Sequence, residues 1–297
     1  MTVDVVCAAP PFLDIVFRGL ERMPQSGEEV LASAVSVVPG AMANVAFALR
    51  QLQLDAVVCS RIGTDPAGRL LQELMAKAGV PWIGEPTGAT SISVALPVDG
   101  DRAFVTVMAD TSIDLDAIAA LAPRAVVVNL PLPGPMPGTP WIYAVVGDPQ
   151  VAVLRAHGLG SLALLRTLFL NEREAQDLTG LADTRDAAAE LAVHGCLVIV
   201  TRGASGAVAA MPDGRVVEAP AIVTDAQDTV GAGDLFTAAF IWADLLDRPL
   251  DERLNLAIAY ASHSLAHPAA GQKGLTVAAF RDVLAATAAP LEWLQEV

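Results

Sequence analysis

The sequence predicts an α/β protein built on a mostly parallel β-sheet, with a small antiparallel β element beside it. Short runs rich in β-branched residues alternate with helical patterns, beginning with residues 3–8 and 43–52, and this alternation is typical of βαβ units. Two segments, residues 29–38 and 91–107, interrupt the alternation. The second contains Asp99-Gly100 between alternating strands, which indicates a hairpin.

The elements follow one another along the whole chain. The first predicted strand and helix are followed by a strand in residues 56–63 and a helix in residues 67–79. Later strands are predicted at 125–130, 168–171 and 196–203, with helices at 172–178 and 184–195, and the chain after Gly231 is almost entirely helical. The proline-rich residues 131–140 predict a long surface loop. Because no repeat or interdomain linker is present, we expect residues 1–297 to form one domain.

The composition limits the classes of partner. The chain has 297 residues, of which 54% are hydrophobic, and a formal net charge of −15. Such a charge repels the phosphates of nucleic acids and anionic membrane surfaces. We therefore expect small molecules as ligands, with no nucleic acid and no membrane as a partner.

Neither of the two long uncharged stretches fits a membrane span. Residues 30–49 contain Pro39 and Gly40, and residues 125–147 contain five prolines, so neither can form an unbroken helix in lipid. The first twelve residues lack a basic region and include Asp4, which argues against a secretory signal. Three cysteines, without a close pair, are expected to be buried small hydrophobes. These observations predict a cytoplasmic protein.

The stretch GAGD, residues 231–234, raises two interpretations. A glycine-rich turn that leads into a helix leaves backbone amides pointing at one spot, and the helix dipole makes that spot attractive to phosphate. Alternatively, Asp234 is simply the cap of a helix N-terminus. Neither the P-loop pattern nor the three-glycine dinucleotide fingerprint is present.

The extended stretch DTVGAGD, residues 228–234, resembles the C-terminal signature of the ribokinase-like (PfkB) carbohydrate kinases. Further family motifs are matched in the same order by Asp14, PGAMANVA, RIGTDPAG, NERE and TRGASG. The resemblance implies a three-layer ribokinase-like fold whose small β lid comes from about residues 12–38 and 90–108. It also implies ATP-dependent, magnesium-requiring phosphorylation of a hydroxyl group of a small sugar.

The resemblance assigns the catalytic roles to the GAGD stretch. Asp234 would be the base that takes the proton of the attacking hydroxyl, and the amides of Ala232, Gly233 and Asp234 would form the anion hole. Because Gly231 and Gly233 have no side chains, an anion could approach these amides closely. Phosphoryl transfer requires both a positioned hydroxyl and positive groups around the transferring phosphoryl. At a helix N-terminus we expect the Asp234 carboxylate to stay ionised at neutral pH.

The sugar site implied by the resemblance consists of Asp14, Gly40 and Asn44. A carboxylate can accept two hydrogen bonds from neighbouring hydroxyls of a sugar, which suits Asp14 for this role. The alternative is that Asp14 is a charge in a loop or on an edge strand. Pro39, in place of the first glycine of a pair, and Pro10-Pro11, in place of Gly-Asp, depart from the family pattern at this site.

For the nucleotide, the resemblance implies contacts from Thr201, Gly203 and Gly206, together with Asn171. Asn171 and Glu174 would also reach Mg²⁺, through water, whereas the alternative for the NERE stretch is an acidic first turn stabilised by the helix dipole. A monovalent cation such as K⁺ is a further candidate ligand, at Asp228 and the loop of residues 268–274.

Three other functions remain open at this point. A nucleoside kinase of the same family would need aromatic stacking for the base, for which the sequence offers Phe12, Phe17, Trp82 and Phe104. A phosphosugar kinase would need a cationic cluster near the lid, for which Arg18 and Arg102 are the candidates. A non-catalytic sugar-sensing protein is the third alternative, and the intact GAGD stretch argues against it. A homodimer formed through the lid is a candidate interaction besides those with sugar and ATP.

Overall fold

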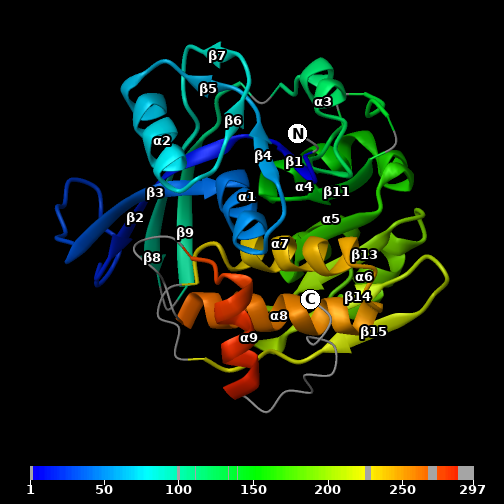
Figure 1. Ribbon diagram of the computed structural model, residues 1–297. Helices are drawn as coiled ribbons and strands as arrows, with labels where there is room; N and C mark the ends of the chain where they lie inside the picture. The colour runs from blue at the N-terminus through cyan, green and yellow to red at the C-terminus, as the bar shows by residue number, and fades with distance from the viewer. Residues whose placement is uncertain are drawn as a thin grey trace.

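The computed structural model describes residues 3–98, 101–110, 112–132, 134–138, 140–224, 229–266 and 273–286. Within these residues the centre of the fold is a nine-stranded sheet with the order β15-β14-β13-β12-β11-β10-β1-β4-β6 (Figure 1). The strands from β13 to β6 in this order are parallel, and β14 and β15 add an antiparallel edge. The strands are β1 (Val5–Ala8), β4 (Ala56–Cys59), β6 (Trp82–Ile83), β10 (Ala125–Asn129), β11 (Trp141–Val145), β12 (Thr167–Asn171), β13 (Leu197–Thr201), β14 (Ala207–Ala210) and β15 (Val216–Ala219).

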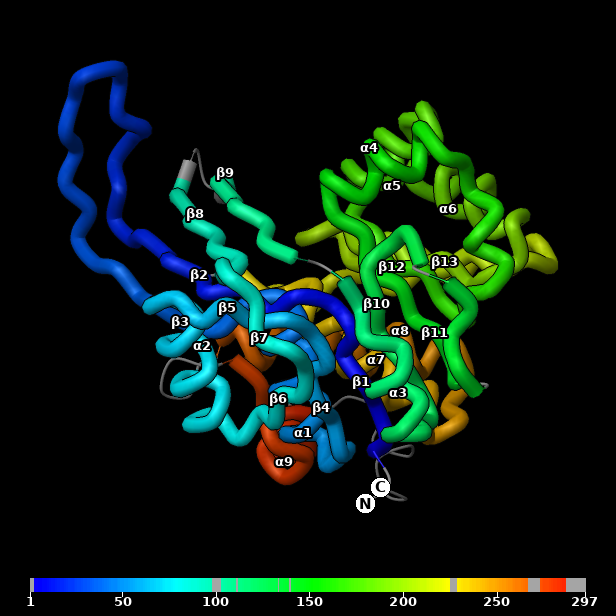
Figure 2. The backbone as a smooth tube through the Cα atoms, turned by 90° about the horizontal axis from the view of Figure 1, so that it is seen from above, coloured from blue at the N-terminus to red at the C-terminus, as the bar shows by residue number. Residues whose placement is uncertain are grey.

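Helices cover both faces of the sheet, so the described part of the chain has three layers. One layer contains α1 (Met42–Gln51), α2 (Pro66–Lys77), α7 (Ala232–Leu245), α8 (Leu250–Ala266) and α9 (Val277–Ala286). The other contains α3 (Leu115–Leu121), α4 (Asp148–His157), α5 (Glu172–Thr179) and α6 (Thr184–Ala192), with short 3-10 helices at Gly160–Leu164 and Gly203–Ser205. Figure 2 shows α4, α5 and α6 across the sheet from α7 and α8.

Strand β1 shows why these sequences form the centre of the sheet. Val5 and Cys7 belong to the core beneath α7 and α8, whereas Val6 and Ala8 belong to the core on the opposite face. Because side chains alternate across a strand, a strand covered on both faces must be apolar at every position. The continuous apolar runs of the sequence therefore become inner parallel strands.

A separate four-stranded sheet, which we call the lid sheet, projects from one side of the molecule (Figure 2). Its order is β3-β2-β8-β9, and its strands are β2 (Pro11–Arg18), β3 (Ala34–Ala41), β8 (Ile92–Val98) and β9 (Asp101–Val107). The β2–β3 and β8–β9 pairs are antiparallel, and β2 pairs with β8 in parallel. The Asp99-Gly100 turn signal lies outside the described residues. A two-stranded sheet, β5 (Ile62–Gly63) with β7 (Pro86–Thr87), completes the fold.

The predicted α/β architecture with a mostly parallel sheet is confirmed, and so are the burial of all three cysteines and, for the described residues, the mainly helical chain after Gly231. One boundary is wrong: the strand expected in residues 29–38 lies at Ala34–Ala41, so residues 29–33 are not part of the lid sheet. Among the described residues, no helix has the length and apolar character needed to cross a membrane. The assignment of residues 1–297 to one domain stays a prediction.

Candidate active site

Most of the candidate residues follow the carboxyl ends of neighbouring parallel strands. Asn171 and Thr201 are the last residues of β12 and β13 and lie opposite each other in the register of the sheet. Asp14 lies on β2, which begins three residues after the end of β1. In open parallel sheets, this edge is where ligands bind. The NERE and TRGASG motifs thus begin side by side at this edge of the sheet.

No side chain caps the N-terminus of α7 by a hydrogen bond. Gly231 is the N-cap residue, with a φ of 81°, a left-handed conformation that favours glycine. Asp234 does not cap the helix; one of its carboxylate oxygens accepts a hydrogen bond of 2.9 Å from the side-chain amide of Asn44. The interpretation of Asp234 as a mere cap is therefore wrong.

The first turn of α7 leaves room for an anion at Gly233. A Cβ atom built at this residue would have no neighbour within 4 Å, so packing gives no reason for a glycine there. The amides of Gly233 and Asp234 donate no hydrogen bond to a described residue, whereas the amide of Ala232 already donates to the carbonyl of Thr229 at 3.1 Å. Of the predicted anion-hole donors, Gly233 and Asp234 are the ones whose amides this conformation keeps available.

Asp14 and Gly40 form one structural unit. Asp14 lies on β2, an inner strand of the lid sheet, and is only 8% exposed, so the alternative of a loop or edge-strand charge is wrong. A Cβ atom at Gly40 would lie 1.9 Å from a carboxylate oxygen of Asp14. Glycine at position 40 is therefore required for β3 to pass beside the carboxylate. Pro39 pairs with Leu13 in the same strand pair, and the departure from the family pattern leaves β3 intact.

Burial sets the charge state of the two carboxylates. Burial and, to a smaller extent, the negative charge of Asp234 together raise the pKa of Asp14 to about 7. Burial raises the pKa of Asp234 more than the hydrogen bond from Asn44 lowers it, and the net result is a pKa of about 6. Asp234 is thus mostly ionised at pH 7, as expected, but the helix N-terminus does not dominate its pKa, because desolvation of the charged form outweighs it.

Asn171 and Glu174 form a reciprocal cap at the start of α5. The Asn171 side chain accepts a hydrogen bond of 2.8 Å from the amide of Glu174, and the Glu174 carboxylate accepts one of 2.7 Å from the amide of Asn171. Glu174 is 8% exposed, and burial raises its pKa to about 7. Glu172, in the same turn, accepts a hydrogen bond from Thr184 and is exposed. Its burial and its raised pKa distinguish Glu174 from an ordinary acidic residue in the first turn of a helix.

The residues expected to contact the nucleotide lie just after β13. The Thr201 hydroxyl donates to the carbonyl of Leu170 at 3.4 Å, which ties β13 to β12. A Cβ atom at Gly203, where φ is 53°, would have no neighbour within 4 Å, whereas one at Gly206 would lie 2.0 Å from the carbonyl oxygen of Ala219. Gly206 is thus explained by close backbone packing, and Gly203 faces open space. Asp228 lies outside the described residues.

Sequence reasoning missed Lys273 as a group of the site. Its ammonium donates a hydrogen bond of 2.7 Å to the carbonyl of Val230, the residue before the N-cap of α7. A positive charge thus lies beside the loop that leads into the candidate anion hole. The chain contains only two lysines, and this one lies in a glycine-flanked stretch, which is the signal that could have identified it.

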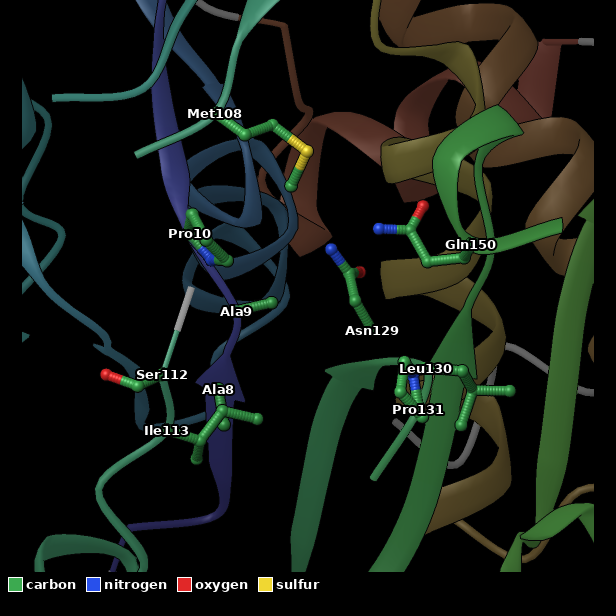
Figure 3. Close-up of a pocket in the computed structure, with 10 residues that line it drawn as sticks. All are labelled: Ala8, Ala9, Pro10, Met108, Ser112, Ile113, Asn129, Leu130, Pro131 and Gln150. Atoms are coloured by element: carbon green, nitrogen blue, oxygen red, sulfur yellow. The ribbon is translucent and has the colours of Figure 1, made fainter. Parts of the chain in front are cut away.

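A cavity of about 250 Å³ lies over the carboxyl ends of β1 and β10 (Figure 3). Its lining includes Pro10, at the entry to β2, and Asn129, at the end of β10. Met108, just after β9 of the lid sheet, and Gln150, in the first turn of α4, complete two of its sides. Sequence reasoning named none of these four residues as ligand contacts, because a cavity assembled from four separate segments leaves no local motif.

Comparisons with known proteins agree with this geometry. The family model described as "pfkB family carbohydrate kinase" matches residues 11–124 and 152–276. An ATP-dependent ribose-1-phosphate kinase of Halopiger xanaduensis is 29% identical over 304 residues, which cover 96% of this chain and 97% of the relative. A ribokinase structure from Thermotoga maritima matches with a TM-score of 0.76 at 19% identity, covering 96% of this chain and 99% of the other. An adenosine kinase structure from Sinorhizobium meliloti also gives 0.76, at 18% identity, covering 97% and 100%.

Proposed function

The chain belongs to the pfkB family of carbohydrate kinases, and on this premise we propose that it transfers the γ-phosphoryl group of ATP to a hydroxyl group of a small sugar. The observation that carries the proposal is the hydrogen bond of 2.9 Å between Asn44 and Asp234. It holds a carboxylate, ionised near neutral pH, at the open N-terminus of α7. A base and an anion hole on the same helical turn are what phosphoryl transfer to a hydroxyl requires.

In this mechanism Asp234 accepts the proton of the attacking hydroxyl. Asn44 fixes the orientation of the carboxylate, and its amide keeps the pKa of Asp234 below the value that burial alone would give. General-base catalysis is most effective when the pKa of the base lies near the working pH, and about 6 meets that condition. Asp14, in turn, accepts hydrogen bonds from other sugar hydroxyls, and Gly40 provides the space that this carboxylate needs.

The transferring phosphoryl group is received by backbone groups of α7. The free amides of Gly233 and Asp234 and the positive end of the helix dipole stabilise the negative charge on its oxygens. Lys273 holds the loop before Gly231 through the Val230 carbonyl and adds a positive charge at the same end of the helix. Thr201, Gly203 and Gly206 line the path of the nucleotide at the end of β13.

Magnesium is the proposed cofactor, and it neutralises charge on the ATP phosphates. No group of three or more His, Cys, Asp or Glu side chains lies close enough to hold a metal in the part of the chain that is described. This suits Mg²⁺, which is usually held by one or two carboxylates, substrate phosphates and water. Glu174, with Asn171, is the candidate to hold that water. A monovalent cation at Asp228 remains a separate proposal.

We also propose that two copies associate through the lid sheet. The face of that sheet opposite Asp14 carries four exposed valines: Val35 and Val37 on β3, and Val105 and Val107 on β9. Their side chains are 38% to 65% exposed. A contiguous exposed apolar face of this kind marks an interaction site. If the proposal is correct, the wild type is a dimer in light scattering, and Val105→Glu shifts it towards the monomer. A monomeric wild type at high concentration would contradict it.

The proposed function is tested by a coupled ATP-consumption screen in the presence of Mg²⁺. Pentoses, hexoses, sugar acids, phosphosugars and nucleosides are each offered to the purified protein. We also propose that the protein is cytoplasmic, where such metabolites are available. If the wild type phosphorylates any of these compounds and Asp234→Asn does not, the proposed kinase function is supported. Binding of a sugar without ATP consumption would instead favour the sugar-sensing alternative.

A further inference from the structure

The cavity over β1 and β10 differs in character from a site built for a bare sugar. Most of its lining is apolar: Ala8, Ala9, Pro10, Ile113, Leu130 and Pro131. A sugar ring carries hydroxyl groups around its whole edge, each of which requires a hydrogen-bond partner when buried. Apolar walls on several sides therefore suit a different chemical group. The volume of about 250 Å³ is slightly below the range of about 300–1,000 Å³ that is usual for drug-sized ligands, and it fits a single flat ring.

The polar side chains among the lining residues are two amides, Asn129 and Gln150, and the hydroxyl of Ser112. Figure 3 shows the side chains of Asn129 and Gln150 on one side of the cavity, opposite Pro10 and Met108. The Gln150 oxygen accepts a hydrogen bond of 3.1 Å from the amide of Gly147, so its NH₂ group is the part left for a ligand. The side-chain amide of Asn129, which is partly buried, makes no hydrogen bond to a described residue. An amide presents a donor and an acceptor side by side, the arrangement that pairs with the edge of a nucleobase.

The uncharged lining of the cavity disfavours a phosphorylated substrate. None of its lining residues is charged, and a phosphate group needs cationic partners. Arg61 lines an adjacent cavity of about 470 Å³ that shares Ser112 and Ile113, but its guanidinium is already paired with Asp110 at 3.0 Å. A substituent bound in the first cavity must therefore be uncharged.

We propose that this cavity binds an uncharged heterocyclic ring attached to the sugar, so that the substrate of the kinase is a nucleoside. The inference rests on the proposed function, because the sugar hydroxyls still face Asp14 and Asp234. Pro10 lies four residues before Asp14 on the same extended segment, so this wall of the cavity and the proposed sugar site are about 13 Å apart or less. The thioether of Met108 and the ring of Pro10 supply the apolar faces that aromatic side chains provide in other base-binding sites.

The test compares kcat/KM for cytidine, adenosine, ribose, ribose 1-phosphate and fructose 6-phosphate in the wild type and in Asn129→Leu. The proposal predicts that a nucleoside has the highest kcat/KM. It further predicts that Asn129→Leu lowers this value by about 10- to 100-fold, the discrimination expected of a lost amide–base pair, while kcat/KM for ribose stays within about twofold. Asn255→Leu, at an exposed position of α8, is the matched control and changes neither value.

The failures of the two proposals are distinguishable. If the wild type phosphorylates ribose or a phosphosugar at least ten times more efficiently than every nucleoside, the nucleoside assignment is overturned and the kinase stands. If Asn129→Leu lowers kcat/KM for ribose and for the nucleoside equally, the side-chain amide of Asn129 does not recognise the base. If no compound is phosphorylated, the proposed function fails, and the inference fails with it. Should the variant not fold, the wild-type substrate ranking alone decides.

Discussion

The side-chain amide of Asn44 donates a hydrogen bond of 2.9 Å to the carboxylate of Asp234, although 190 positions separate the two residues. The contact joins α1, which follows the lid sheet, to α7, which presents the candidate anion hole. It also counteracts the effect of burial on the pKa of Asp234. The residue that the family resemblance assigned to the sugar thus has a second role, since it controls the orientation and charge of the proposed base.

Replacing Asn44 with Leu tests this second role. Because the hydrogen bond lowers the pKa of Asp234, its loss raises that pKa, and ionisation of the base requires a higher pH. We expect the acid limb of the kcat–pH profile to shift upward from about 6. The deficit in kcat should then be smaller at pH 8.5 than at pH 6.5. A deficit that is the same at both pH values would mean that Asn44 does not influence the ionisation of Asp234.

Replacing Asp14 with Asn should stabilise the free protein at alkaline pH. The folded-state pKa of about 7 lies above the ordinary value of 3.8, so the folded state binds more protons than the unfolded state between these values. Stability contributed by Asp14 is therefore present at low pH and is lost as the pH rises through about 7. We expect the melting temperature of the variant to exceed that of the wild type at pH 8, with little difference at pH 3.5.

The same variant has a kinetic signature. The proposed contacts of Asp14 are to the sugar, so KM for the sugar substrate should rise far more than KM for ATP. Asn keeps the size of the side chain that Gly40 accommodates, so packing is retained. An equal rise in both KM values would remove Asp14 from the sugar site, whereas a lower melting temperature at pH 8 would contradict the raised pKa of Asp14.

Much of this arrangement was predictable from the sequence, and the misses have physical causes. Continuous apolar runs identified β10, β12 and β13, but β11, with its five residues, was hidden behind the prolines of residues 131–140. The β14–β15 edge was missed because β14 is a short alanine-rich run with a weak strand signal and β15 has only four residues. Motif order identified Asp234 and Asn44 separately. Their hydrogen bond, the burial of Asp14 beneath Gly40 and the pocket at Asn129 depend on packing between distant segments, which local patterns do not encode.

Gly233→Ala separates stability from function. Alanine is more favourable than glycine inside a helix by about 1 kcal/mol, and the new methyl group meets no atom within 4 Å. We therefore expect a slightly higher melting temperature. The methyl group would, however, occupy the space beside the free amides, so kcat/KM for ATP should fall by at least roughly tenfold. A variant that is both more stable and fully active would show that no phosphate approaches this turn.

Glu174→Gln isolates the proposed magnesium role from the capping role. Glutamine can accept the same hydrogen bond from the amide of Asn171, so the reciprocal cap and the melting temperature should be nearly unchanged. Loss of the negative charge should move the Mg²⁺ dependence of turnover to higher concentrations. Glu172→Gln, in the same helical turn, is the control and leaves the Mg²⁺ titration unchanged. If both variants titrate as the wild type does, Glu174 is only a cap.

The central claim is that Asp234 is the proton acceptor, and the turnover of Asp234→Asn tests it most directly. Asn keeps the size of the side chain, and because Asp234 does not cap α7, the helix should remain intact. General-base catalysis contributes roughly 10²- to 10⁴-fold, so kcat on the best substrate of the screen should fall by about that factor. ATP affinity should stay the same or improve, because a negative charge near the phosphates is lost. A folded variant with kcat near that of the wild type would contradict the account.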